Sequence, residues 1–459
     1  MFMREISQPV SRRDVLLRLS AATSFVGAGG LGSVATGWAD EGDDVPDKSR
    51  LHHDGKVKSV IFYYCQGGPS QAHTFDPPSY VEDEKLHPFK FTKSGQSGIE
   101  ICDLFPNLQT VADDLCLIRG GYGAKASHGA AGNYMFRGSN DLGASIGAWV
   151  LYGLGTGNPA LPGHVCVKGK LPGDDWLGNG GRLRGGDGVL TAGGLPSQLQ
   201  ALVVNDMTDP IPNVKSFYGS QQAQWLEALK QVNGRHAERR LRPADLVARN
   251  EVFDTAFRMQ TAAPEAFDVS KESADKTIRK RYGLDAKETR TTGAKCLLAR
   301  RLVERGVRFI TIPASNTPMK SGGLNGAWDT HTYKQSIEGI PTLCQSCDLP
   351  LTGLIQDLKE RGLFDQTLIV WGGEMGRGDS GHLNHNPNSF TWWLAGGGVK
   401  GGHVHGASDD KSSSAVEDIV HMRDFHSTIL WLAGLDHTKL EFQGKKLDSR
   451  CRVIQEVIA

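Results

Sequence analysis

Apolar runs alternate with helical patterns along this chain, and that alternation restricts the fold more than any other feature of the sequence. Residues 57–66 (VKSVIFYYCQ) have the pattern of a buried strand, and residues 307–313 (VRFITIP) and 367–371 (TLIVW) repeat it. Helical periodicity precedes the two later runs, at 296–305 and 352–361. Strands separated by helices in this way build a mostly parallel sheet covered by helices. The sequence therefore predicts an α/β fold.

Further elements fit the same plan. Residues 115–119 predict a short strand, followed by a helix that begins near Ser127, and residues 390–395 (FTWWLA) continue the series of apolar runs. Residues 424–433 predict a late helix, and the charged segment 215–305 is rich in helical patterns. In sheets of this type the chemistry collects at the carboxyl ends of the strands. Polar residues that directly follow the apolar runs are therefore the candidates for a functional site.

The first 39 residues predict an export signal of the twin-arginine type. Arg12 and Arg13 precede an apolar segment at 16–34, and the small-x-small pattern at 37–39 suits cleavage after Ala39. A membrane-spanning helix needs about 20 predominantly apolar residues, and this segment is short and rich in glycine. We therefore expect a protein carried by the twin-arginine translocase to the periplasm or beyond. A signal that was retained would instead anchor the protein to the membrane.

Composition restricts the classes of partner. Lys plus Arg and Asp plus Glu both number 51, so the net charge is zero and no nucleic-acid partner is expected. No segment after the signal is apolar for long enough to span a membrane, so no permanent span is expected.

Residues 40–459 suffice for one large domain, in which 215–305 would be a helix-rich insertion. Cys344 and Cys347 have the spacing of a redox or zinc half-site, but without a second such pair they predict an incidental pair on a helix.

Carboxylates and imidazoles follow several of the predicted strands. Asp329 and His331 lie two residues apart in a loop after a strand, Glu374 follows another strand, and His385 comes soon after it. Six of the 15 histidines fall between residues 382 and 426. Asp, Glu and His at successive strand ends are the ligand types of divalent metals. The set therefore predicts a metal or polyanion site, whereas any single member could equally be a hydrogen-bonded loop residue.

Ser127 and His128 form a second constellation at the start of a predicted helix. The free N–H groups and the dipole of a helix N-terminus favour negative charge. Ser127 could therefore act as a nucleophile or bind a phosphate or sulfate group. A plain N-cap is the competing interpretation, and this segment alone favours it.

Several motifs together resemble one protein family. They are residues 67–71 (GGPSQ), 74–77 (TFDP), 328–331 (WDTH), 371–377 (WGGEMGR), 385–387 (HNP) and 393–402 (WLAGGGVKGG). The family is the bacterial, twin-arginine-exported, sulfatase-like family that is classed as a domain of unknown function within the alkaline phosphatase superfamily. The resemblance runs from about residue 40 to the C-terminus. Residues 127–138 and 423–430 are similar to the superfamily's nucleophile helix and to its late Asp–Thr–Leu helix.

This resemblance implies an alkaline-phosphatase-like three-layer sandwich that binds one or two divalent metals, usually Zn, Ca, Mg or Mn. It implies hydrolysis of phosphate or sulfate esters of small molecules or glycans through a metal-activated nucleophile. By the same resemblance the catalytic candidates are Ser127, as the nucleophile, with His128 and Glu374. The metal-ligand positions match Asp329, His331, Glu374 and His385. Candidates for supporting these ligands or for binding substrate are His73, Asp76, Arg377, Asn384 and His426.

The sequence also departs from the superfamily pattern. The first strand is followed by Gln-Gly-Gly where an aspartate is usual, and Glu374-Met375 replaces an Asp-His pair. His73 and Asn384 stand where relatives often carry aspartate. The Cys/Ser-x-Pro-x-Arg motif of formylglycine sulfatases is absent at Ser127. We therefore expect a sulfatase-like hydrolase without formylglycine, in which one metal is easier to assemble than two.

Three functions remain open from the sequence. The first is an exported metal-dependent hydrolase of phosphate or sulfate esters. The second is a fold that has lost catalysis and binds an anionic glycan or a protein partner, because an aspartate and an imidazole of the usual site are missing. The third is a phosphomutase or transferase, which would use the same site with a different acceptor.

Overall fold

The computed structural model describes residues 51–123, 125–138, 143–172, 174, 183, 186–212, 221–237, 243–314, 328–378, 380–447 and 450–459. The predicted export signal, with Arg12 and Arg13, lies outside these residues. The chain divides into two compact units. The smaller unit includes Ile211–Glu265, and the larger unit comprises Asp44–Pro210 and Ala266–Ala459.

A nine-stranded sheet is the centre of the larger unit. Its order is β12-β4-β11-β8-β1-β7-β5-β6, and β15 also pairs with β4. Neighbouring strands are parallel except around β11, which runs against both β4 and β8. The strands are β1 (Ser59–Tyr64), β4 (Leu115–Tyr122), β5 (His164–Val167), β6 (Leu202–Val204), β7 (Phe309–Pro313), β8 (Thr367–Gly372), β11 (Phe390–Ala395), β12 (His403–His405) and β15 (Val420–His421).

Within the described residues, four two-stranded antiparallel sheets accompany the large one. They pair β2 (Phe91–Ser94) with β3 (Ile99–Cys102), β9 (Gly376–Gly378) with β10 (Asn384–Asn386), β13 (Ala407–Ser408) with β14 (Ala415–Glu417), and β16 (Glu441–Phe442) with β17 (Lys445–Lys446). The α-helices of the larger unit are α2 (His128–Arg137), α3 (Ile146–Leu154), α6 (Ser270–Ser273), α7 (Lys276–Tyr282), α8 (Arg290–Glu304), α9 (Tyr333–Glu360) and α10 (Met422–Leu432).

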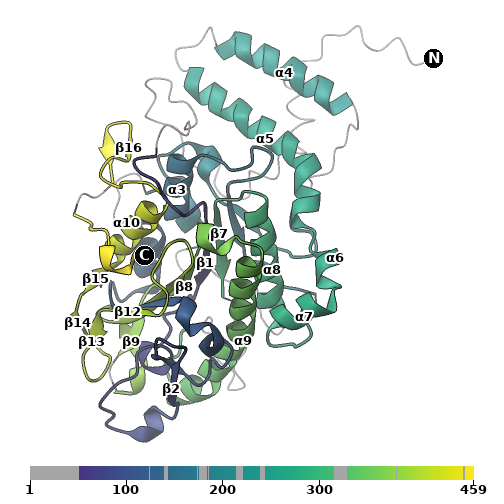
Figure 1. Cartoon of the computed structure of the whole chain (residues 1–459). Helices are drawn as coiled ribbons and strands as arrows, with labels where there is room; N and C mark the ends of the chain where they lie inside the picture. The colour runs from purple at the N-terminus through teal and green to yellow at the C-terminus, as the bar shows by residue number, and fades with distance from the viewer. Residues whose placement is uncertain are drawn as a thin grey trace. The chain divides into compact units, whose positions relative to one another are not determined.

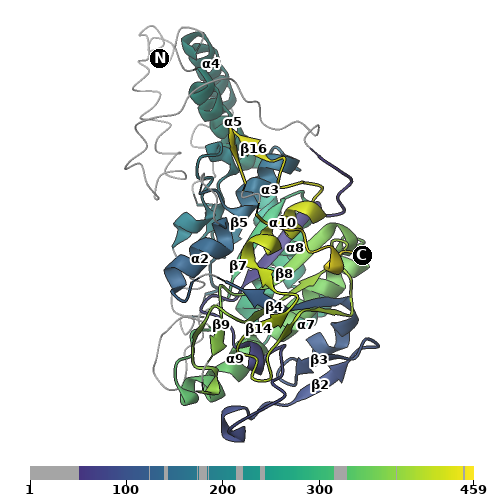
Figure 2. The same ribbon diagram turned by 90° about the vertical axis from the view of Figure 1, so that its left-hand side faces the viewer.

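Helices cover both faces of the sheet (Figures 1 and 2). On one face Tyr64 of β1 meets Phe136 of α2, with 4.8 Å between ring centroids, and Trp392 of β11 stacks on Phe425 of α10 at 4.4 Å. Tyr63, the neighbour of Tyr64, points to the other face, towards the cysteines of α8 and α9. Successive strand residues point to opposite faces, so a strand buried on both sides is apolar throughout. The prediction of an α/β fold with a mostly parallel central sheet is confirmed.

Helix α9 is longer than the sequence pattern indicated. The pattern predicts a helix at 352–361, but α9 begins at Tyr333 with a capping box between Thr332 and Gln335. Pro341 and Pro350 lie inside it and interrupt the sequence signal. Cys344 and Cys347 lie on this helix as buried free thiols, as predicted for an incidental pair.

The smaller unit is helical. Its helix α4 (Gln221–Ala237) lies beside α5 (Pro243–Phe267), which continues into the larger unit, and an ion pair of 3.3 Å joins Lys230 to Asp254. In the part of the chain that the structure describes, no helix combines the length and the apolar composition needed to cross a membrane.

The carboxyl ends of the parallel strands meet at one edge of the sheet. Tyr64, the last residue of β1, lies level with Pro313 of β7 on one side and with Gly372 of β8 on the other. Because β11 runs the opposite way, its first residue, Phe390, lies at this same edge, level with Gly121 of β4. The sheet therefore brings together the segments that follow β1, β4, β7 and β8 and the segment that precedes β11.

Candidate metal centre

Three imidazoles converge on one carboxylate oxygen at this edge. The Oδ1 atom of Asp329 lies 2.8 Å from Nε2 of His331 and 3.0 Å from Nε2 of His128. It lies 3.4 Å from Nε2 of His385. The three histidines come from different parts of the chain: the segment after β7, the start of α2, and β10. The fold, not local sequence, therefore assembles the group.

One ligand atom from each of these four residues lies within 4.8 Å of the other three. Four ligands at about 2.0–2.1 Å from a tetrahedral zinc ion lie roughly 3.3 Å apart. The separations of 2.8, 3.0 and 3.4 Å between the imidazole nitrogens and Oδ1 of Asp329 are close to that value. The residues present therefore fit a divalent metal ion, and the cluster of His128, Asp329, His331 and His385 is called the histidine cluster below.

The other ring nitrogen of two of these histidines is held by an acceptor. Nδ1 of His128 lies 2.7 Å from Oε1 of Glu374, and Nδ1 of His385 lies 2.7 Å from the carbonyl oxygen of Ala126. A carboxylate and a carbonyl oxygen only accept hydrogen bonds, so each Nδ1 carries the proton. In a neutral ring this leaves the lone pair on Nε2, which faces Asp329. Metal-binding histidines are commonly fixed in this way.

Glu374 is completely buried behind His128. Its carboxylate accepts hydrogen bonds from the backbone N–H of Gly67, at 2.9 Å, and from the hydroxyl of Tyr64, at 2.9 Å. With His128 as a third partner, the carboxylate is fully engaged. Glu374 therefore lies one step behind the histidine cluster, where it orients a ligand, whereas the sequence suggested a ligand or general base.

Arg377 supports the cluster from the other side of Asp329. Its guanidinium is fully buried, and Nη2 lies 2.6 Å from Oδ1 of Asp329. Its remaining donors reach main-chain carbonyl oxygens of three loops, namely those of Gly67, Gly68, Trp328, Thr330 and Leu383. A guanidinium occupied in this way positions Asp329 and is not offered to a substrate.

Gly67 allows these loops to approach each other. It has a φ of +101°, in the region that favours glycine, and a Cβ atom there would lie 2.6 Å from the backbone nitrogen of Asp329. The Gln-Gly-Gly turn after β1 therefore contributes backbone groups, and not a carboxylate, to the site. Its N–H binds Glu374 and its carbonyl oxygen binds Arg377.

The electrostatics favour a charged Asp329 beside a neutral His385. Burial disfavours the charged carboxylate, but hydrogen bonds from His128 and Arg377 and the charge of Arg377 hold the pKa of Asp329 well below its usual range. Burial, His128 and Arg377 lower the pKa of His385. A carboxylate anion with neutral imidazoles is the protonation state that binds a metal.

The histidine cluster is open to solvent on one side. The exposed fraction of the side chain is 37% for His331, 25% for His385 and 13% for His128. A polar pocket of about 420 Å³ adjoins the cluster, since His385 also lines it. A ligand can therefore reach the cluster from outside.

Ser127 lies at the rim of the cluster, because both of its neighbours in the chain contact it or belong to it. Ala126 binds His385 through its carbonyl oxygen, and His128 is a member of the cluster. Ser127 is the N-cap of α2, but its side chain makes no capping hydrogen bond and is exposed. Its assignment as a nucleophile stays a prediction.

Two other predicted residues, His73 and Asp76, lie outside the cluster. His73 is buried between Ser70 Oγ and the carbonyl oxygen of Leu86, both at 2.9 Å, and burial lowers its pKa to about 3. Asp76 accepts a hydrogen bond from Ser408 at 2.7 Å; burial raises its pKa despite the nearby Arg119. Both have structural partners in the loops around the site.

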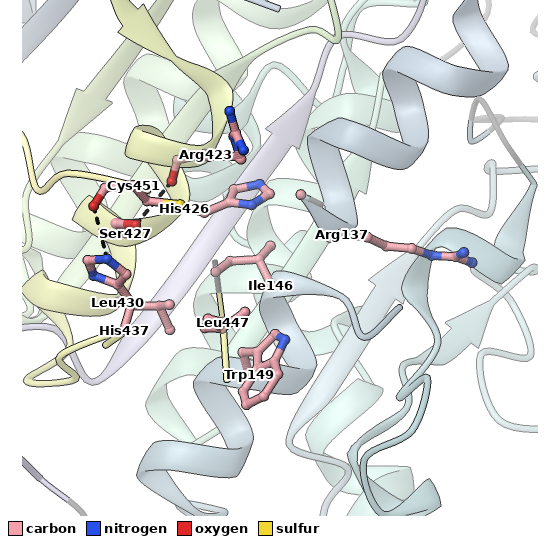
Figure 3. A pocket seen from close by; sticks show the side chains of 11 residues that line it. Arg137, Ile146, Trp149, Arg423, His426, Ser427, Leu430, His437, Leu447 and Cys451 are labelled. Carbon is pink, nitrogen blue, oxygen red and sulfur yellow. Dashed lines mark hydrogen bonds between the residues drawn. The ribbon is translucent and has the colours of Figure 1, made fainter. Parts of the chain in front are cut away.

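Asn384 and His426 are also apart from the cluster. Asn384 is exposed and pairs with Gly378 across the β9–β10 sheet. His426 binds the carbonyl oxygen of Met135 at 2.7 Å, and burial lowers its pKa to about 4. It lines a separate cavity of about 30 Å³, enough for about one water molecule (Figure 3). Of the six histidines between 382 and 426, only His385 belongs to the cluster.

The sequence did not predict the roles of two residues at the site, His128 and Tyr64. His128 was a catalytic candidate because it adjoins Ser127, whereas the structure makes it a potential ligand with Glu374 behind it. Tyr64 looked like an ordinary strand residue, and only its position as the last residue of β1 indicated that its hydroxyl reaches the site edge.

Comparison with solved structures finds weak similarity over most of the chain. One is a protein in the alkaline phosphatase superfamily from Vibrio parahaemolyticus, at 10% identity and a TM-score of 0.35, covering 84% of this chain and 68% of that one. Another is the phosphonate monoester hydrolase of Silicibacter pomeroyi, at 12% identity and a TM-score of 0.35, covering 88% of this chain and 76% of that one. A third is the lipoteichoic acid synthase LtaP of Listeria monocytogenes, at 10% identity and a TM-score of 0.37, covering 89% of this chain and 77% of that one.

No curated protein sequence matches the chain. A family model does: it covers residues 57–458, from two residues before β1 to the last residue but one, and so includes every member of the histidine cluster. The chain therefore belongs to the family described as "Protein of unknown function (DUF1501)".

Proposed function

We propose that this protein is an exported, metal-dependent hydrolase of phosphate or sulfate esters, with zinc as the metal. The observation that carries the proposal is the convergence of three imidazole Nε2 atoms on Asp329 beside an open polar pocket. A neutral His385, whose Nδ1 proton is already used, would present a lone pair to the Asp329 carboxylate, which is unfavourable unless a cation lies between them. This arrangement supports a bound cation.

The donor set selects among the metals that the resemblance allowed. Three nitrogen donors and one oxygen suit zinc, whereas calcium and magnesium prefer oxygen ligands. A bound zinc ion would polarise an ester oxygen and lower the pKa of a bound water or hydroxyl group. Asp329, His128, His331 and His385 would hold the ion, Glu374 would fix His128, and Arg377 would fix Asp329.

Ser127 is the candidate nucleophile because its hydroxyl is not used to cap α2 and because the residue directly precedes His128 of the cluster. The N-terminus of α2 would stabilise negative charge that develops there. The chain lacks the formylglycine motif at this position, so any nucleophilic role would belong to the unmodified serine.

One observation favours a second candidate, a non-catalytic exported binding protein that carries a structural metal. Four protein ligands complete a tetrahedron, as in structural zinc sites, whereas catalytic sites keep one position for water or substrate. The exposed fractions of His331 and His385 favour the hydrolase, because a structural site is normally enclosed.

Elemental analysis of the purified protein tests the metal. We expect about one zinc ion per chain, as in mononuclear His-rich sites. A His128→Ala/His385→Ala double variant should lose it, and a His403→Ala/His405→Ala variant, in β12, should keep it. A wild-type protein that stays metal-free after incubation with Zn, Ca, Mg and Mn would contradict both candidate functions.

Replacing Ser127 tests the nucleophile. With phosphate and sulfate monoesters as substrates, Ser127→Ala should lower kcat by on the order of 10³-fold or more while zinc content is unchanged. Ser273→Ala, on α6, is the matched control and should have wild-type activity. Full activity in Ser127→Ala would transfer the role to a water molecule; zinc without any ester turnover would favour the binding protein.

Glu374→Gln tests whether the carboxylate behind His128 supports metal binding. The zinc affinity, measured by competition with a chromogenic chelator, should fall by about 10- to 100-fold. Tyr64→Phe removes one neutral hydrogen bond to the same carboxylate and should have a smaller effect. Equal affinities in all three proteins would mean that Glu374 does not position His128.

Export depends on the arginine pair in the proposed signal. Cell fractionation should place the wild-type protein in the periplasm or outside the cell, and an Arg12→Lys/Arg13→Lys variant in the cytoplasm. Periplasmic accumulation of that variant would contradict the twin-arginine route. Retention of the wild type in the membrane fraction would instead indicate that the signal is kept as an anchor.

A further inference from the structure

The polar pocket beside the histidine cluster has three walls from distant parts of the chain. They are the segment 80–87, the turn and strand at 378–388, and the loop 411–414. The walls are fastened to each other. The N–H of Tyr80 binds the carbonyl oxygen of Asp410 at 2.9 Å, and Lys411 Nζ lies 2.5 Å from Oε1 of Glu82. The pocket is therefore formed before any ligand binds.

Most of the residues that line the pocket are polar, which is unusual for a small-molecule site. Asn388, Ser413 and Ser414 contribute amide and hydroxyl groups. His87 also lines it, although its Nδ1 atom is itself buried. Ligand hydroxyl groups both donate and accept hydrogen bonds, so they match a lining of amide and hydroxyl groups.

The charge of the pocket opposes a second anionic group. Lys411 is the one Lys or Arg among the described residues that line it, and it is already paired with Glu82. Asp83, whose carboxylate accepts a hydrogen bond from the N–H of Lys85, adds a negative charge to the same wall. The charged part of an ester would therefore bind at the histidine cluster, and the pocket suits an uncharged part of the same molecule.

Tyr80 supplies an aromatic surface in this polar setting. Its exposed fraction is 51%, and the ammonium group of Lys411 lies 5.5 Å from its ring centroid. An aromatic ring presented among amide and hydroxyl groups provides both kinds of contact that a sugar ring offers, an apolar C–H face and hydroxyl groups around it.

We propose that this pocket binds an uncharged sugar residue as the alcohol part of the ester, with Tyr80 as its aromatic contact and Asn388, Ser413 and Ser414 as hydrogen-bond partners. The proposal rests on the proposed hydrolase function and names its substrate class: monoesters of otherwise neutral glycans. His385, shared by the pocket and the cluster, places the ester bond between the two.

The first test compares two substrates of different size on the full chain. For a hexose 6-phosphate or 6-sulfate, Tyr80→Ala should raise KM by about 3- to 10-fold, the value of one aromatic contact. For ethyl phosphate or ethyl sulfate, which carry no sugar, KM should not change. Tyr80→Phe keeps the ring and should behave as wild type, as should Trp225→Ala on α4. An equal effect on both substrates, or none on either, overturns the sugar pocket while leaving the hydrolase standing.

The second test does not depend on turnover. A panel of methyl glycosides is titrated into the purified protein, and binding is followed by saturation-transfer NMR. Binding by the wild type and by Tyr80→Phe that Tyr80→Ala loses would support the pocket even if no ester were hydrolysed. Absence of binding to every glycoside, or binding that Tyr80→Ala retains, overturns the proposal.

Discussion

The buried pair between Arg377 and Asp329 is the interaction on which the site depends. A guanidinium without solvent contact is costly to bury, and only a complete set of acceptors offsets that cost. Here the acceptors are main-chain carbonyl oxygens from the segments after β1 and β7 and from the turn before β10, together with Asp329. The same cation thus holds three loops in register and keeps the carboxylate charged. Loss of either partner would leave an uncompensated charge, which costs about 3–5 kcal/mol in buried pairs.

Much of the fold could be predicted because its central strands are buried on both faces. β1, β7, β8 and β11 read as continuous apolar runs, and the helices between them end at glycine, as α8 does before Gly306. The start of α9 could not be predicted, because Pro341 and Pro350 break a local pattern that tertiary packing overrides. The antiparallel direction of β11 could not be predicted from its sequence, because a continuous apolar run is compatible with either strand direction.

The site was predictable in part for a similar reason. Asp329, His331 and His385 are recognisable because they follow strand ends, and the sheet brings such segments together. Which residue faces the centre, Glu374 or His128, was not predictable, because it depends on the hydroxyl of Tyr64 and the backbone N–H of Gly67, which hold Glu374 behind His128. Histidine density was a poor guide, because His73 and His426 are satisfied by nearby main-chain oxygens. For Arg377 the sequence left two roles open, support of the ligands and substrate binding, because it does not show which main-chain carbonyl groups surround the side chain.

The reversed direction of β11 has a consequence for how this architecture can vary. A parallel strand delivers to the functional edge the residues that come after it, whereas β11 delivers those that come before it. The hairpin of β9 and β10 therefore lies between the end of β8 and the start of β11, tethered at the same edge by both its ends. Insertions or deletions between Gly378 and Asn384 would remodel the wall of the pocket without shifting any strand of the sheet. Within this frame, the wall of the pocket can diverge while the geometry of the histidine cluster stays fixed.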